Sequence, residues 1–125
     1  MTIIQAIQEA DNLRPNMFDV KDKINWLSRL DLRIKTEIFD RHVRNDGESE
    51  ITFSGYGPDD RDTELLVGEP WAEMYVHWLE AQIDYYNAEL DSFNASNAMF
   101  ESVFSAWAND YHAKHAPKSA RKSYF

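Results

Sequence analysis

The chain has 125 residues, a net charge of −9 and no Cys, which indicates one domain and excludes disulfides and thiolate metal ligands. Hydrophobic residues make up 43% of the chain and aromatic residues 14%, enough for a core with aromatic area left for contacts with other chains. No segment has the apolar length of a membrane span, and residues 1–5 lack the pattern of a signal peptide.

The charge is unevenly distributed along the chain. Residues 1–45 carry eight basic and seven acidic groups, residues 46–111 carry one basic and fifteen acidic groups, and residues 112–125 carry four basic groups. The acidic middle argues against wrapping nucleic acid, which requires a cationic face. An acidic excess also serves solubility alone, whereas the divided charge suits contacts with partners of opposite charge.

Two amphipathic helices are predicted in the first third of the chain. The first spans residues 3–12, where Thr2 can cap the helix and Pro15 stops it. The second spans residues 19–43, with Asp19 as its cap. Its apolar face consists of Trp26, Leu27, Leu30, Ile34 and Ile38.

The least regular segment is residues 44–69, where we expect a long acidic loop or a short β-hairpin. Turn residues fill positions 55–60, while residues 51–53 and 64–67 have the composition of short strands. A loop this long is often functional, so we interpret it as an arm that contacts neighbouring subunits, with an ordinary surface hairpin as the alternative. The residues expected to make that contact are Ile51, Phe53, Tyr56, Asp59, Asp60 and Asp62.

An aromatic stripe dominates the second half of the chain. A third helix is predicted to begin at residues 68–71, with Pro70 in its first turn, and a fourth to span residues 96–114. The stripe keeps steps of three and four residues from Leu79 to Tyr111, so one continuous helix would remain in phase. Poor helix formers instead favour a break near residues 92–96, which would let the two aromatic faces pack against each other.

Pro117 ends the last helix and divides the chain into a helical domain, residues 1–117, and a basic tail, residues 118–125. Alone, such a tail is expected to be disordered, although its terminal aromatic residues can anchor in a partner's pocket. The tail residues expected to contact a partner are Lys118, Arg121, Lys122, Tyr124 and Phe125.

The sequence contains no recognisable catalytic or cofactor pattern. Its four Gly residues form no phosphate-binding motif, its four His residues form no metalloprotease motif, and the acidic cluster at residues 59–64 lacks the spacing of a calcium loop. Glu80 and Asp84 lie one helical turn apart, but no further groups are predicted to converge on them. We therefore expect no enzyme activity, no cofactor and no resident metal.

Several segments resemble small proteins encoded by tailed phages and prophages. They are Leu13-Arg14-Pro15-Asn16, residues 26–31, residues 62–71 leading into residues 74–84, Tyr86-Asn87 and Met99-Phe100. Over about residues 10–117 the chain resembles the head-to-tail connector proteins of long-tailed phages, which are also called adaptor or head-completion proteins. These motifs are structural, and the resemblance brings no catalytic residues with it.

The resemblance implies an all-α fold, a small bundle of three to four helices with a protruding loop. It further implies a homo-oligomeric ring, typically a dodecamer, that links the portal protein to the tail or to a stopper protein. Such a subunit is assembled in the host bacterial cytoplasm and resides in the virion, with no membrane contact. DNA would pass through the ring's channel without sequence-specific binding.

Ring subunits meet through two different, complementary surfaces, which the acidic middle on one side and the more basic first helix pair and tail on the other can provide. The tail is also a candidate for docking to the portal. A tail-completion or tail-terminator subunit would differ only in the ring that it joins. The alternative function, from a different class of protein, is that of a small acidic regulatory or adaptor protein that binds a host or phage protein.

Overall fold

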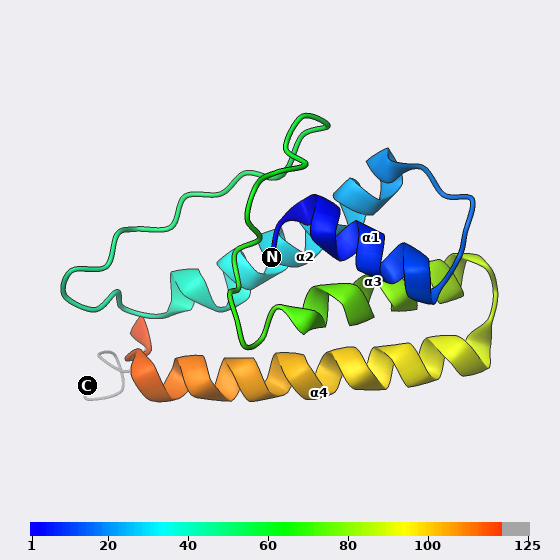
Figure 1. Ribbon diagram of the computed structural model, residues 1–125. Helices are drawn as coiled ribbons and strands as arrows, with labels where there is room; N and C mark the ends of the chain where they lie inside the picture. Colours follow the sequence, from blue (N-terminus) through cyan, green and yellow to red (C-terminus); the bar gives the residue numbers. More distant parts are fainter. Residues whose placement is uncertain (119–125) are drawn as a thin grey trace.

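The aromatic stripe folds back on itself as an antiparallel pair of helices, α3 (Glu73–Tyr86) and α4 (Leu90–Lys114). The computed structural model describes residues 1–118, and Figure 1 shows α4 as the base of the bundle with α3 lying along its first half. Trp78 of α3 packs on Phe100 of α4, with ring centroids 5.1 Å apart. The two aromatic faces are therefore covered within one subunit.

Helices α1 (Ile3–Leu13) and α2 (Val20–Glu37) complete an all-helical bundle of four α-helices within residues 1–118. Helix α1 begins with a capping box, in which the Thr2 hydroxyl accepts from the Gln5 N–H at 3.2 Å and the Gln5 side chain accepts from the Thr2 N–H at 2.8 Å. This arrangement satisfies N–H groups that a helix start leaves without partners. The expected helix over residues 3–12 is thus confirmed, one residue longer.

The second helix is shorter than expected, because it ends at Glu37 rather than at residue 43. A single 3-10 turn, η1 (Phe39–Arg41), follows it. The Phe39 ring packs edge-on against Trp107 of α4, with ring centroids 5.9 Å apart, and at a tilt against Tyr111, with centroids 5.3 Å apart. Burial of this ring against α4 accompanies the departure of the backbone from the α-helical path.

The break between α3 and α4 lies at residues 87–89, not at the expected 92–96. The Ala88 N–H donates to the Tyr85 carbonyl at 3.0 Å and the Glu89 N–H to the Asp84 carbonyl at 2.9 Å, and Ala88 has φ 57°. These are the bonds and the left-handed residue of a Schellman motif. The poor helix formers that suggested a later break lie inside α4, where the buried Ser96 donates to Asp84 at 2.8 Å.

The third helix begins at Glu73, so the expected start at residues 68–71 is wrong and Pro70 lies outside the first helical turn. Trp71, Met74 and Tyr75 each donate an N–H to the carbonyl three residues earlier, at 3.1 Å. These tight-turn bonds carry the chain into the helix.

The segment between η1 and α3 is an irregular loop. Neither of the expected hairpin strands, 51–53 and 64–67, forms within the described part of the chain. The later part of the loop pairs with the start of α1 instead, where Ile3 donates to the Thr63 carbonyl at 3.0 Å and Leu65 donates to the Met1 carbonyl at 3.0 Å. Loop carbonyls thereby satisfy N–H groups at the beginning of α1.

A buried carboxylate, Asp31 of α2, joins this loop to the bundle. Its side chain is fully buried and accepts from the Tyr75 hydroxyl at 2.6 Å, from the Leu66 N–H at 3.2 Å and from the Tyr56 hydroxyl. The Tyr75 hydroxyl in turn accepts from the Val67 N–H at 2.9 Å. Burial raises the pKa of Asp31, against the opposing effect of its three hydrogen-bond donors.

Replacing Asp31 with Asn should lower the free energy of unfolding by about 2 kcal/mol, because the amide cannot accept from all three donors. Urea unfolding followed by circular dichroism measures the loss. The matched control is Asp40→Asn, which removes a half-exposed carboxylate paired with Lys35 and should change stability by less than about 0.5 kcal/mol.

The pH dependence of this difference provides a second check. Since the folded-state pKa of Asp31 is raised above its ordinary value of 3.8, the folded protein binds the proton more tightly than the unfolded chain does. The stability of the parent protein should therefore increase relative to Asp31→Asn as the pH falls toward 3.8. A difference that moves the other way would contradict the raised pKa.

Replacing Ala88 with Gly should increase the free energy of unfolding by about 0.5 to 1 kcal/mol, because relief of the left-handed strain exceeds the added entropy of the unfolded chain. Ala98 lies exposed within α4, and the control Ala98→Gly should destabilise by about 1 kcal/mol. Urea unfolding of both variants measures the effect, and equal losses at the two positions would argue against the Schellman motif.

Candidate contact surfaces

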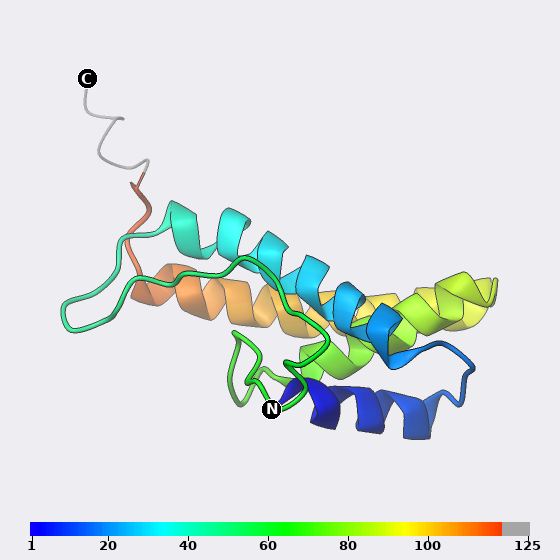
Figure 2. The same ribbon diagram turned by 90° about the horizontal axis from the view of Figure 1, so that it is seen from above.

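The first part of the loop runs alongside α2, as Figure 2 shows. Gly55 has φ 118°, and a Cβ there would lie 3.0 Å from the Ser28 hydroxyl. That same hydroxyl accepts the N–H of Tyr56 at 3.0 Å. The hydrogen bond to Ser28 therefore holds the loop close to α2 next to Asp31. The short distance and the positive φ require glycine at residue 55.

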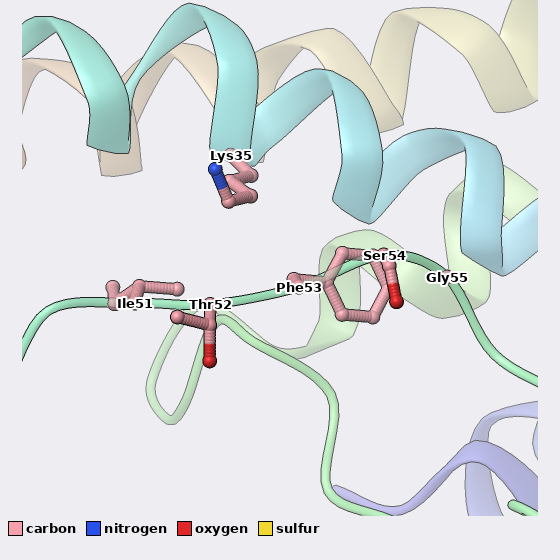
Figure 3. Close-up of a pocket in the computed structure, with 6 residues that line it drawn as sticks. All are labelled: Lys35, Ile51, Thr52, Phe53, Ser54 and Gly55. Carbon is pink, nitrogen blue, oxygen red and sulfur yellow. The ribbon is translucent and has the colours of Figure 1, made fainter.

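The six loop residues expected to contact partners differ in their surroundings. Ile51 and Phe53 are partly buried and line a shallow hollow of about 520 Å³ together with Lys35 of α2, and Figure 3 shows Lys35 on α2 across from the loop. The Lys35 ammonium is paired with Asp40 at 2.9 Å. Lys35 is the one titratable side chain lining this hollow. The hollow therefore provides a mixed surface of apolar and hydroxyl side chains with one lysine beside it, without converging acid–base groups.

Tyr56 and Asp60 are engaged within the subunit. The Tyr56 hydroxyl donates to Asp31. Burial of the hydroxyl is the larger cause, and the negative charge of Asp31 the smaller cause, of a raised pKa of Tyr56. Asp60 closes a turn by accepting the Gly57 N–H at 2.6 Å. Asp59 and Asp62 are exposed, so they present the acidic charge of the loop outward.

The start of the loop meets the segment after α4 at one end of the bundle. The Val43 N–H donates to the Ala116 carbonyl at 2.7 Å, and the Arg44 guanidinium donates to the Tyr111 hydroxyl at 2.9 Å. Lys118 is exposed here, while Arg121, Lys122, Tyr124 and Phe125 lie outside the described residues. The described part of the chain thus ends beside the start of the loop, at a place that we call the tail end.

Two histidines face each other at the tail end. His42 Nε2 lies 2.6 Å from His112 Nδ1, and His42 Nδ1 lies 2.6 Å from the Ile38 carbonyl. Within residues 1–118 no group of three or more His, Cys, Asp or Glu side chains is placed to hold a metal ion. The pair is accounted for as a hydrogen-bonded link between the loop and α4.

The carboxylates Glu80 and Asp84 serve the structure of the bundle. Arg14, at the end of α1, contacts Asp84 at 3.2 Å and Glu80 at 3.6 Å, and His77 lies 3.2 Å from Glu80. Both carboxylates are buried. Together with the Ser96 bond, these contacts link α1, α3 and α4. The expectation that no further groups converge on this pair is therefore wrong, because the pair is buried where three helices meet.

A second surface, which the sequence analysis did not anticipate, lies at the opposite end of the bundle. There the α1–α2 connection and the α3–α4 turn meet (Figures 1 and 2). Tyr86 stacks on Trp26 at 5.3 Å and contacts Tyr85 at 5.2 Å, and Tyr85 contacts Phe93 at 5.6 Å. We call this surface the end patch, and its members are Met17, Phe18, Tyr85, Tyr86, Leu90 and Phe93.

The end patch is exposed although its residues are large and apolar. Met17 is 99% exposed, Leu90 65%, Tyr85 55% and Tyr86 50%. Large apolar side chains that remain exposed at one end of a bundle are candidates for contact with other molecules. Its signal in the sequence is the aromatic stripe itself, which continues to Tyr86, the last residue of α3, and resumes with Leu90 and Phe93 at the start of α4.

No family model, curated protein or solved structure matches this chain. None of the helices within residues 1–118 combines the length and apolar composition needed to cross a membrane. The assignment of a role therefore depends on the surfaces described above and on the sequence resemblance.

Replacing Tyr56 with Phe should release the loop while leaving the helices folded. Loss of the hydroxyl removes one donor to Asp31, and we expect about 1 kcal/mol lower stability and faster amide hydrogen exchange over residues 56–67. The matched control is Tyr85→Phe, because the Tyr85 side chain is half-exposed. Unchanged exchange in the loop would show that Tyr56 does not hold it.

Proposed function

We propose that this protein is a virion structural protein, the ring-forming head-to-tail connector subunit that links the portal to the tail of a long-tailed phage. The observation that carries the proposal is the pair of unlike surfaces at opposite ends of one bundle: the exposed apolar end patch and the tail end with its basic segment. Subunits of a ring meet through two such different surfaces. The resemblance of residues 10–117 to connector proteins supports the same role.

The loop supplies the protruding arm in this proposal. Residues 56–67 are held by Asp31 and by α1, whereas Ile51 and Phe53 border the hollow beside α2. We assign Ile51 and Phe53 to contacts with a neighbouring subunit. The exposed Asp59 and Asp62 are assigned to the channel, where negative charge repels DNA phosphates and lets DNA pass without binding.

The role is structural rather than catalytic. The buried carboxylates Asp31, Glu80 and Asp84 all have partners within the subunit. In this role the subunit is assembled in the host bacterial cytoplasm and resides in the virion. Its partners are the portal and a tail, stopper or tail-terminator protein.

The second candidate is a small acidic regulatory or adaptor protein that binds a host or phage protein. The net charge of −9 favours this candidate.

Mixing the protein with purified portal should yield a complex whose mass matches a ring of this chain, with a dodecamer expected, seated on the portal. Native mass spectrometry measures the stoichiometry and electron microscopy the ring. Phe53→Asp should weaken ring formation, because it places a charge in the assigned contact. Met99→Asp, at a residue 53% exposed on α4, is the control.

A chain that remains monomeric or dimeric with portal, and that does not bind portal, would contradict the connector role. Stoichiometric capture of one host or phage enzyme, with loss of that enzyme's activity, would establish the regulatory role in its place.

A further inference from the structure

We propose that the basic tail, residues 118–125, binds the end patch of a second copy of this chain. This contact adds a specific interface to the proposed function. That the contacts close into a ring rests on the proposed function. The contact assigns a partner to the exposed apolar end patch and to the basic tail.

Charge complementarity favours this occupant. Three exposed acidic residues, Asp19, Glu89 and Asp91, flank the end patch, and none of them takes part in an ion pair within residues 1–118. The tail carries Lys118, Arg121 and Lys122 and no acidic side chain. Opposite charges around an apolar centre set the orientation in which such a segment binds.

The apolar chemistry also matches. Tyr124 and Phe125 close the tail, and the end patch offers Tyr85 and Tyr86 at about half exposure. Aromatic rings pair with one another beyond simple burial of area, and the basic side chains of the tail can lie over the tyrosine faces.

The tail cannot reach the end patch of its own subunit. It leaves at the tail end, where the Ala116 carbonyl is bonded to Val43, and the end patch lies at the start of α4 (Figure 1). The 25 residues of α4 span about 37 Å at 1.5 Å per residue. Residues 119–125 extend at most about 25 Å, so the patch that they fill belongs to another copy.

A contact of this kind is directional. The tail of one copy occupies the patch of the next, whose own tail remains available for a third copy. Such heterologous contacts generate a closed ring when the rotation between subunits closes and an open chain when it does not. Each contact is short and partly electrostatic, so we expect it to be weak in isolation and weaker at high salt.

Single-cysteine variants test the proposal directly, because the natural chain has no Cys. One full-length chain carries Leu90→Cys in the end patch and a second carries Ser123→Cys in the tail. Mixed at high concentration under mild oxidation, they should form a disulfide-linked heterodimer roughly tenfold faster than a Met99→Cys and Ser123→Cys mixture. Leu90 and Met99 are 65% and 53% exposed, so the two partner sites are matched in accessibility.

A second arm tests the chemistry of the contact. Adding Tyr124→Ser and Phe125→Ser, or separately Arg121→Glu and Lys122→Glu, to the tail variant should reduce crosslinking to the Met99→Cys level. Equal rates at Leu90→Cys and Met99→Cys, or rates unaffected by these tail changes, would overturn the proposal. Crosslinking of Ser123→Cys to the portal alone would overturn it too, by assigning the tail to a different partner.

The mass of the ring formed with portal, measured on the same samples, tests the connector role separately from the contact between tail and end patch. Rings without preferential crosslinking at Leu90→Cys would reject the tail–patch contact and leave the connector role standing. Preferential crosslinking without rings or portal binding would retain the contact between copies and reject the connector role.

Discussion

The structure depends on one shared acceptor, the buried carboxylate of Asp31. Two tyrosine hydroxyls and a backbone N–H converge on it from the loop and from α3. A buried carboxylate is costly unless its lone pairs are satisfied, and here three donors satisfy it. A loop that lacks secondary structure of its own is therefore fixed to the bundle at residues 56–67.

The bundle places two kinds of surface as far apart as its length allows. Helix α4 is eleven residues longer than α3, so its second half is covered by Phe39 and the loop base rather than by α3. Tyr85 and Tyr86 lie at the other end of the pair, where α3 turns into α4, and each remains about half exposed. The mismatch in helix length thus accounts for the way in which the tail end is covered.

Much of the helical architecture could be predicted from sequence, because apolar spacing in α1 and α2 and the aromatic stripe have a clear helical period. The break at residues 87–89 could not, since Ala88 occupies a left-handed position that usually carries Gly. Of the two alternatives for residues 44–69, the loop forms and the hairpin strands do not. The residues resembling a strand near position 65 pair with Met1, a contact distant in sequence that composition does not reveal.

The opposite placement of the two surfaces has a consequence for how growth of an assembly stops. A self-complementary face ends growth at two copies, whereas unlike ends add copies indefinitely unless the last one meets the first. The angle between neighbours then decides between a closed particle and a fibre. A template of defined symmetry can impose that angle on a weak contact, and weakness in free solution keeps stray polymers from forming before the template is present.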